Sequence, residues 1–229
     1  MIIIFFSGNL HKAREISQIL QNCEVRLYSE FVDKFSIEES GKTFAQNAKI
    51  KLLGLKARLE KCAFDSAQFG GKRVVLMAED SGLCVESLDN FPHIFSARFA
   101  SLPPLSLCDS RSLADGARGW VDSTDSENIT RLICELKAKN LSESNAQFIS
   151  CVACYDISQN LAQNAQILTT HGFLNGKVIC EIRGKNGFGY DPIFVPNGFE
   201  STLAEMPSIA KNALSHRARA LKLMALRLK

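Results

Sequence analysis

Two pairs of neighbouring acidic residues are the first side chains in this sequence whose types could support chemistry. Glu38-Glu39 and Glu79-Asp80 each lie next to a glycine-containing turn, and the second pair follows the apolar stretch 73–78. Magnesium in proteins takes one or two carboxylates, completed by water and phosphate oxygens, and a further carboxylate role is that of a general base. The pairs therefore fit a metal-assisted hydrolysis, and they fit two solvated turns equally well.

A turn between an expected strand and an expected helix could hold an anion. Residues 2–6 predict a buried strand and residues 11–20 predict a helix. A helix N-terminus carries unpaired N–H groups and a partial positive charge, so a cation such as Lys12 in the first turn makes sense if an anion lies beside it. An ordinary strand–helix turn is the alternative. The residues concerned are Ser7, Gly8, Asn9, Leu10, His11 and Lys12.

The segment 183–192 alternates glycines with cations, aromatic residues and Asp191. Phe188 and Tyr190 are flanked by glycines, which is a poor placement for a core and suits a wall that stacks on a nucleobase. Such stacking contributes about 1–3 kcal/mol per base. The alternative is a β-turn with buried aromatic residues.

The last expected helix carries Lys211, His216 and Arg217. These side chains could donate several hydrogen bonds to keto or phosphate oxygens. A solvated basic helix face is the alternative for the same residues.

The elements that must position these residues predict an α/β protein. A strand, a glycine turn and a helix open the chain, which is typical of that class. Thr43 and Gln46 form a capping-box pattern that begins a long helix. Its apolar stripe consists of Phe44, Ala48, Leu52, Leu55 and Leu59.

The second half of the chain mixes strands and helices. Strands are expected over 73–78, 83–85, 148–155, 166–173 and 177–182, with a turn at 175–176; helices are expected over 128–139 and from Pro207 to 228. Residues 101–124 read as a long loop, of the kind that forms lids or binding segments. The mixture predicts a long mixed central sheet flanked by helices.

Composition narrows the classes of protein and partner. The 229 residues are 46% hydrophobic and 22% charged, as in ordinary globular proteins, and the formal net charge is +3. That charge is too small for a nucleic-acid polymer as partner but suits a small polyanion. No apolar run approaches the roughly 20 residues of a membrane helix, so we expect no membrane association and a cytoplasmic location.

The eight cysteines are expected to be free thiols of a reducing compartment. Cys151 and Cys154 form a Cys-x-x-Cys pattern, but it lies in an expected buried strand and lacks the second ligand pair of a zinc site. We therefore expect no zinc there.

Taken together, these blocks resemble the inosine triphosphate pyrophosphatase family, the house-cleaning enzymes for non-standard purine nucleotides. The matching blocks are SGNLHK (7–12), EESGKTFAQNAKIK (38–51), DSGL (80–83), SAR (96–98), GFGYDPIF (187–194), Lys211 and SHR (215–217). The resemblance implies one two-lobed domain over 1–229 around a deep active-site cleft, usually as a homodimer. It implies Mg²⁺-dependent hydrolysis of inosine, deoxyinosine and xanthosine triphosphates (ITP, dITP, XTP) to the monophosphate and pyrophosphate.

The resemblance also implies a role for each site residue. Asp80 would be the base and, with Glu38, would serve the magnesium ion. Residues 7–12 would hold phosphate, and Ser81 would contact substrate. Asn47 and Lys51, one turn apart on a helix, would face the same cleft. The base and the nearby phosphate would be held by Phe188, Gly189, Tyr190, Asp191, Lys211, His216 and Arg217.

Three departures from the family pattern carry expectations of their own. Glu79 replaces the usual first aspartate, so its longer side chain would support the metal from further away. Asn90-Phe-Pro-His93 replaces a Gly-Ala-Pro-Gly segment, and His93 is not expected to copy a glycine with positive φ. The 101–124 loop is longer than usual.

Three alternative functions stay open. A pyrophosphatase for modified pyrimidine or other non-purine nucleotides would use the same phosphate chemistry. A nucleotide-binding regulatory protein without turnover would be marked by loss of the metal carboxylates, yet Glu38 and Asp80 are present. A nucleic-acid-binding module using the basic terminal helix is disfavoured by the small net charge.

Overall fold

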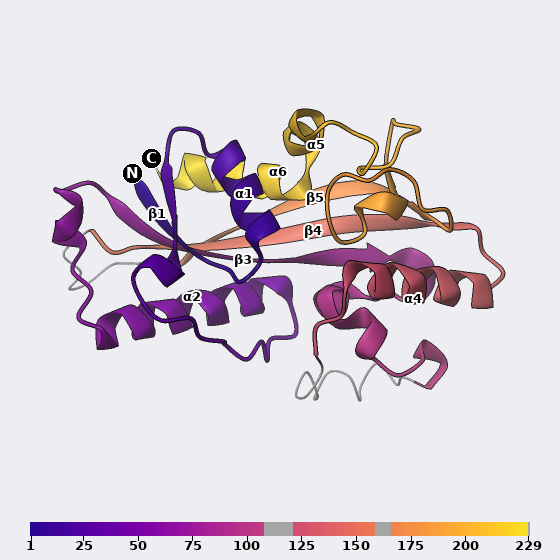
Figure 1. Cartoon of the computed structure of the whole chain (residues 1–229), viewed down its shortest axis with the longest axis horizontal. Helices are drawn as coiled ribbons and strands as arrows, with labels where there is room; N and C mark the ends of the chain where they lie inside the picture. Colours follow the sequence, from indigo (N-terminus) through magenta and orange to yellow (C-terminus); the bar gives the residue numbers. More distant parts are fainter. Residues whose placement is uncertain (108–120, 159–165, 229) are drawn as a thin grey trace. The chain divides into compact units, whose positions relative to one another are not determined.

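The computed structural model describes residues 1–107, 121–158 and 166–228 (Figure 1). Its sheet has the strand order β2-β1-β3-β4-β5-β6. β1 runs parallel to β2 and β3, whereas β5 and β6 are antiparallel, so the mixed sheet expected from the sequence is confirmed. The strands are β1 (Ile2–Phe6), β2 (Glu24–Leu27), β3 (Val74–Val85), β4 (Glu143–Asp156), β5 (Leu168–Ile179) and β6 (Phe194–Pro196).

Helices flank the sheet, again as expected. The α-helices are α1 (Leu10–Ile19), α2 (Phe44–Lys61), α4 (Asp125–Ala138), α5 (Ser208–Leu214) and α6 (His216–Arg227). Short 3-10 turns include η4 (His93–Ser101), η5 (Leu105–Leu107) and η6 (Asp191–Ile193). Within the described residues, none of the helices is both long and apolar enough to cross a membrane.

The chain divides into two compact units. Unit 1 comprises 1–80, 150–172 and 217–229, and unit 2 comprises 81–149 and 173–216. Each of β3, β4 and β5 contributes residues to both units.

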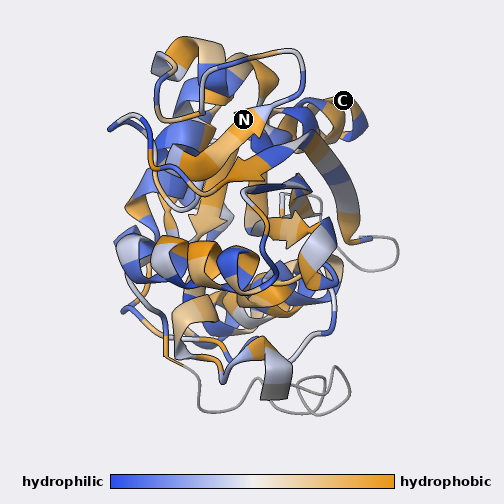
Figure 2. Ribbon diagram, turned by 90° about the vertical axis from the view of Figure 1, so that its right-hand side faces the viewer, coloured by the Kyte–Doolittle hydropathy of each residue, from blue (hydrophilic) through white to orange (hydrophobic). Residues whose placement is uncertain are grey.

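The core of unit 1 lies between one face of its strands and the helices α1 and α6. Ile3 and Phe5 of β1 and Val75 and Met77 of β3 share this core with Ile16 of α1, among others. Figure 1 shows α2 on the opposite side of the same strands. β1 is apolar along its length, as its orange colour in Figure 2 shows. Unit 1 is therefore a sheet covered by helices on both faces.

Unit 2 has a separate core built on one face of β3, β4 and β5. Leu83, Phe148 and Leu174 come from these strands, and Leu132 of α4 and Phe99 of η4 pack against them. The residues of β5 alternate between buried and exposed from Thr170 to Gly176, so the other face of this strand is exposed there. One-sided burial of this kind is typical of antiparallel strands.

The helix expected after Thr43 is confirmed, together with its buried stripe. The Thr43 side chain accepts a hydrogen bond from Gln46 N at 3.2 Å, as a cap should. The return contact of the capping box differs, since Gln46 Oε1 accepts from Lys42 N at 2.7 Å instead of from the Thr43 backbone.

The turns expected within two strands are wrong. β3 continues through 79–82, and β5 continues through Asn175 and Gly176. Gly176 is needed for close approach, because a Cβ atom built there would lie 2.3 Å from Val195 O of the paired strand β6. The glycine signals a strand-to-strand contact here instead of a chain reversal.

The expected single terminal helix is wrong as well. α5 ends at Leu214, and α6 begins at His216 after Ser215, whose ψ of 151° is not helical. Pro207 caps α5 from outside instead of lying in its first turn. The break places Lys211 and Arg217 on two different helices.

His93 corrects a further expectation, because its φ of +52° is the conformation that a glycine would supply. The left-handed region is small for residues with a Cβ atom but allowed, and Asn, Asp and His are the residues that enter it most often. Asp89 and Asn90 in the same segment also have positive φ. Of the long loop expected over 101–124, residues 108–120 lie outside the described residues, and Leu105–Leu107 form η5.

The described cysteines are free thiols. Cys151 and Cys154 are buried in β4, and an odd spacing along a strand points their side chains to opposite faces. Burial raises the pKa of the Cys151 thiol to about 12. Both features suit packing and not metal binding.

Candidate active site

Glu79 and Asp80 are buried in the middle of β3, not exposed at the end of a strand. They are 2% and 6% exposed. Successive side chains of a strand point to opposite faces of the sheet. Glu79 therefore shares the face of Val75 and Met77, towards α1 and α6, and Asp80 points to the face covered by α2. The acidic pair supplies two separate sites in unit 1.

The Glu79 carboxylate binds two cations and a hydroxyl group. Lys12 Nζ of α1 lies 2.8 Å from Glu79 Oε2, and Arg217 Nη2 of α6 lies 3.1 Å from Oε1. Ser150 of β4 donates to Oε1 at 2.8 Å. Arg217 Nη1 also pairs with Glu15 of α1. Two carboxylates and two cations thus form a balanced buried cluster, the arrangement in which buried charges are tolerated.

The Asp80 carboxylate belongs to a second charged cluster. Lys51 Nζ of α2 lies 2.8 Å from Asp80 Oδ1 and 3.3 Å from Glu39 Oε1. Burial raises the pKa of Asp80 above its usual value, with Glu39 adding to this effect and Lys51 opposing it. Burial acts to lower the pKa of Lys51, but the charges of Asp80 and Glu39 outweigh it and raise that pKa. Asp80 Oδ2 is buried without a hydrogen-bond partner in the described part of the chain.

The loop that carries Glu38 is held by Asn47. Asn47 is buried in α2, and its Oδ1 accepts from Gly41 N at 2.8 Å. Glu38 itself is exposed, and its neighbour Glu39 makes the contact with Lys51. Asn47 and Lys51 lie on one buried face of α2.

The turn from Ser7 to Lys12 caps its own helix. Asn9 Oδ1 accepts from His11 N at 2.9 Å and from Lys12 N at 3.2 Å, and Ser7 Oγ accepts from Asn9 N at 3.0 Å. Gly8, Leu10 and His11 are exposed. The sequence indicated an anion beside Lys12, and the anion that the structure places there is the Glu79 carboxylate.

In unit 2, Asp191 organises the glycine-rich segment. Its Oδ2 accepts from Phe188 N at 2.8 Å and from Lys211 Nζ of α5 at 2.6 Å. Lys211 Nζ also lies 4.7 Å from the centre of the half-buried Phe188 ring. Gly187 has φ +78°, and a Cβ atom there would lie 2.0 Å from Asp191 Oδ2, so both its conformation and its lack of a side chain are required.

Tyr190 and His216 are core residues of unit 2. The expectation from the sequence that Tyr190 is poorly placed for a core is wrong. Tyr190 is 3% exposed, and its hydroxyl donates to Ser96 O at 2.8 Å. Burial raises its pKa. The buried His216 ring stacks on Phe148 with ring centres 4.8 Å apart. Ser81, the first residue of unit 2, is half-buried in β3.

Sequence reasoning missed several of these partners. Glu15 follows Lys12 by one helical turn, a spacing that places both on one face of α1, and this signal could have been read. Ser150, in contrast, lies in an apolar strand and gives no local signal. Asp125 of α4 was also missed, although its Oδ2 accepts from Gly189 N at 2.6 Å.

A magnesium ion would find few carboxylate ligands in the described part of the chain. Across the described residues, no group of three or more His, Cys, Asp or Glu side chains is arranged to hold a metal ion. Magnesium needs only one or two carboxylates, however, since water and phosphate oxygens complete its shell. The buried Asp80 Oδ2 atom has no hydrogen-bond partner within residues 1–107, 121–158 and 166–228, which suits that requirement.

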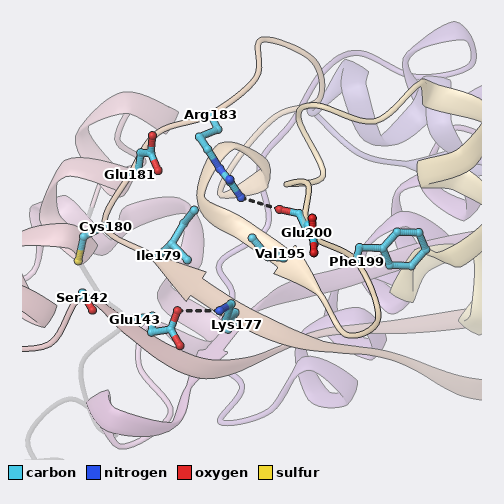
Figure 3. A pocket seen from close by; sticks show the side chains of 10 residues that line it. All are labelled: Ser142, Glu143, Lys177, Ile179, Cys180, Glu181, Arg183, Val195, Phe199 and Glu200. Carbon is cyan, nitrogen blue, oxygen red and sulfur yellow. Dashed lines mark hydrogen bonds and ion pairs between the residues drawn. The ribbon is translucent and has the colours of Figure 1, made fainter.

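Two cavities among the described residues of unit 2 lie away from the expected site residues. One of about 550 Å³ is lined by residues of β4, β5 and the segment 195–200 (Figure 3). Two of its cations have partners, since Lys177 Nζ lies 2.7 Å from Glu143 Oε2 and Arg183 donates to the Glu200 backbone carbonyl at 2.8 Å. A second cavity of about 600 Å³ is lined mainly by polar residues such as Asn145, Gln147 and Asn175. None of the expected site residues lines either cavity.

The fold and the two charged clusters on β3 define a class: an α/β protein with an enzyme-like site of buried carboxylates and cations. The chain belongs to the Ham1 family, because the family model described as "Ham1 family" matches residues 3–226. The resemblance seen in the sequence is thereby confirmed, as is the enzyme class, a nucleoside triphosphate pyrophosphatase.

Individual relatives and structures agree with this assignment. A dITP/XTP pyrophosphatase from Nautilia profundicola is 36% identical over 229 residues, covering 100% of this chain and 98% of the relative. A dITP/XTP pyrophosphatase from Campylobacter concisus is 37% identical over 223 residues, covering 97% of this chain and 94% of the relative. A HAM1 protein structure from Coxiella burnetii has a TM-score of 0.71 at 31% identity and covers 100% of this chain and 98% of its own.

Proposed function

We propose that this chain hydrolyses inosine, deoxyinosine and xanthosine triphosphates to the monophosphate and pyrophosphate, with magnesium, and so removes them from the nucleotide pool. The names of the relatives support this substrate class. The single observation that carries the chemistry is the buried Asp80 carboxylate, with one oxygen on Lys51 and the other without a hydrogen-bond partner in the described part of the chain.

Asp80 has the properties of a general base for water. Burial raises its pKa, which makes the carboxylate a stronger base than an exposed aspartate. Lys51 fixes the orientation of the carboxylate through Oδ1, so that Oδ2 is the oxygen that takes the proton from the attacking water. The attack falls on the α-phosphorus, and pyrophosphate leaves.

Asp80 and Glu38 are the residues that would hold magnesium. Glu39, the neighbour of Glu38 in the chain, forms an ion pair with Lys51. When bound, the metal supplies positive charge that neutralises the phosphates and favours ionisation of a water molecule. The exposed position of Glu38 suits a ligand that meets the ion together with its substrate. Glu79 holds Lys12 and Arg217, so any support that it gives to the metal would pass through these two cations.

Cations of unit 1 provide the charge for a polyphosphate. Lys12 is 17% exposed at its side chain, so its ammonium group is reachable while Glu79 keeps it in place. Lys51 is held in the same way by Asp80 and Glu39. Cations fixed in advance lose little conformational freedom when a triphosphate binds, which favours binding.

Unit 2 carries the proposed base recognition. The half-buried Phe188 ring, with Lys211 beside it, offers a surface on which a purine can stack. A donor such as His216, and Arg217 as the next residue of the chain, would suit the keto oxygen at position 6 of inosine and xanthosine, whereas the amino group of adenosine would face donors with no acceptor. Guanosine shares the keto group, so its rejection must involve the 2-amino group.

Product analysis tests the proposed reaction. The purified protein is incubated with ITP and magnesium, and the products are separated by ion-exchange chromatography. We expect inosine monophosphate and pyrophosphate in equal amounts. Inosine diphosphate and orthophosphate would contradict the proposal, as would a preference for modified pyrimidine triphosphates over ITP under the same conditions.

Two further expectations from the resemblance also belong to this proposal. The enzyme acts as a homodimer, which light scattering of the purified protein would test against a monomer of 25.3 kDa. It acts in the cytoplasm, which cell fractionation would test.

A further inference from the structure

The glycine-rich segment 187–191 is tied to the first residue of α4. Gly189 N–H donates to Asp125 Oδ2 at 2.6 Å, although the two residues are 64 positions apart. Both belong to unit 2. None of the motifs in the sequence pointed to Asp125, so this contact connects the segment to an unexpected part of the chain.

Gly189 depends on this hydrogen bond because side-chain packing does not hold it in place. Its φ is +61°, and a Cβ atom built there would meet no atom within 4 Å. Glycine also has the largest conformational freedom of any residue. The neighbouring residues are fixed differently: Phe188 N–H donates to Asp191 Oδ2, and the Tyr190 hydroxyl donates to Ser96 O.

Asp125 is well suited to hold an N–H group. It is the first residue of α4, where the helix dipole stabilises a negative charge. A carboxylate is also a stronger acceptor than a neutral oxygen. Because Asp125 is exposed, it can be replaced without disturbing a core.

We propose that Asp125 is a positioning residue for base recognition: it fixes Gly189 and thereby the orientation of the neighbouring Phe188 ring. This inference rests on the proposed function, in which a purine stacks on Phe188. Asp125 does not touch the reacting phosphate. Its loss should therefore weaken substrate binding and leave the chemical step nearly unchanged.

The test uses Asp125→Ala, which removes the acceptor, and Asp125→Asn, which retains an acceptor oxygen. Ser126→Ala is the matched control, since Ser126 is the next exposed residue of the same helix turn. Two quantities are measured in the full-length protein: hydrogen exchange of the Gly189 amide by NMR, and KM and kcat for ITP.

We expect Asp125→Ala to speed Gly189 exchange and to raise KM about tenfold, the size of one hydrogen bond to a charged group, with kcat within about twofold. Asp125→Asn should recover most of both effects, and Ser126→Ala should match the wild type. A purely structural role would not produce this separation of KM from kcat with rescue by asparagine.

Two results would overturn the inference: unchanged Gly189 exchange in Asp125→Ala, or faster exchange with unchanged KM. A fall in kcat as large as the rise in KM would also contradict a positioning role. Failure of the proposed function is recognised separately, because the wild type would then not hydrolyse ITP, while the exchange measurement would still decide whether Asp125 holds the segment.

Discussion

Burial is the property that separates the two acidic residues of β3 from ordinary surface carboxylates. Both Glu79 and Asp80 are almost fully buried, but their partners differ. Glu79 is surrounded by Lys12, Arg217 and a hydroxyl group, whereas Asp80 has one oxygen on Lys51. The first environment suits a structural anion, and the second suits a base, because Oδ2 of Asp80 has no hydrogen-bond partner among the described residues.

Asp80→Asn should lower kcat for ITP by at least about 100-fold, because an amide cannot take the proton of the attacking water. Substrate binding should survive in part, since Lys12 is retained. Steady-state kinetics gives kcat, and Glu60→Gln, a change at an exposed residue of α2, serves as the control. Near-normal turnover of Asp80→Asn would show that the base lies elsewhere.

The main expected effect of Arg217→Ala is a loss of protein stability, and not a change in substrate selectivity. Removing the guanidinium leaves Glu15 without this cation and Glu79 with Lys12 alone, a change in a buried cluster that costs about 3–5 kcal/mol. Urea unfolding at pH 7 would measure this loss. Arg219→Ala, on an exposed position of the same helix, should cost far less.

Arg217→Lys is the better variant for selectivity, because lysine keeps the charge and loses the planar fork of donors. We expect the ratio of kcat/KM for ITP over ATP to fall about tenfold, as for one lost charged hydrogen bond. Equal slowing with inosine, xanthosine, guanosine and adenosine triphosphates would instead indicate that Arg217 serves phosphate and not the base.

At the scale of elements, the ends of strands are fixed by ion pairs and close backbone contacts. Arg73, just before β3, pairs with Asp156 at the end of β4 at 2.6 Å and also donates to Leu228 O. Gly176 allows β5 to approach β6. Both features can be tested by their effects on stability.

The Arg73–Asp156 pair should contribute to stability only where Asp156 is ionised. Burial acts to raise the pKa of Asp156, but Ser158 and Arg73 outweigh it and lower that pKa. A lowered carboxyl pKa gives stability that is present above about pH 4 and is lost as pH falls through the folded-state pKa. Asp156→Asn should therefore cost about 0.5–1 kcal/mol at pH 7 and less near pH 3.

Urea unfolding of wild type and Asp156→Asn at both pH values checks this difference. Glu181→Gln is the control, since Glu181 is exposed and its replacement should leave the unfolding free energy unchanged at either pH. A cost that stays constant from pH 7 to pH 3 would exclude ionisation as its source.

Gly176→Ala should destabilise the protein by about 1–3 kcal/mol, because the new methyl group would meet a backbone carbonyl that the strand pairing holds in place. Thermal unfolding gives the cost. Asn175→Ala changes an exposed neighbour and should cost less. If the two variants are equally stable, a methyl group at position 176 fits beside β6 without strain.

Elements with strong local signals could be predicted from the sequence, and those fixed by distant partners could not. The strand 2–6 and the helix after Thr43 follow from apolar runs and a cap. The segment 79–82 looks like a turn, because two acidic residues beside Ser and Gly are usually exposed. Only the cations brought from α1, α2 and α6 make its burial possible, and their proximity is not encoded locally.

Prediction of the candidate site from the sequence meets the same limit. Lys12 and Asp80 were identified from their positions near turns and strands, yet their partners Glu79 and Lys51 come from other elements. Tyr190 lies between glycines and is nonetheless buried, since its hydroxyl finds an acceptor on Ser96. Flanking glycines indicate the backbone conformation near a residue. Whether that residue is buried depends on the side chains that pack against it.

At the scale of the whole molecule, the described fold is held by its own cores and ion pairs. Unit 1 and unit 2 each have an apolar core. A metal that serves only the reaction can then be removed without unfolding the protein. This separates a catalytic ion from a structural one.

Chelation should abolish ITP hydrolysis and leave the circular dichroism spectrum unchanged, and added magnesium should restore activity at once. Calcium is the comparison ion, because its larger radius and looser coordination fit the same oxygens less well. Full activity after exhaustive chelation would contradict a metal-assisted mechanism, and loss of structure would indicate a structural metal.

The uninterrupted course of β3 has a consequence for the kinds of sequence change that the chain can tolerate. Because neighbouring side chains alternate, removing one residue between Val74 and Ala78 would turn the two carboxylates towards each other's helices. Glu79 would then meet α2, and Asp80, shorter by one methylene group, would face α1 and α6. Apolar residues in this stretch can be exchanged for one another, but their number can change only in steps of two.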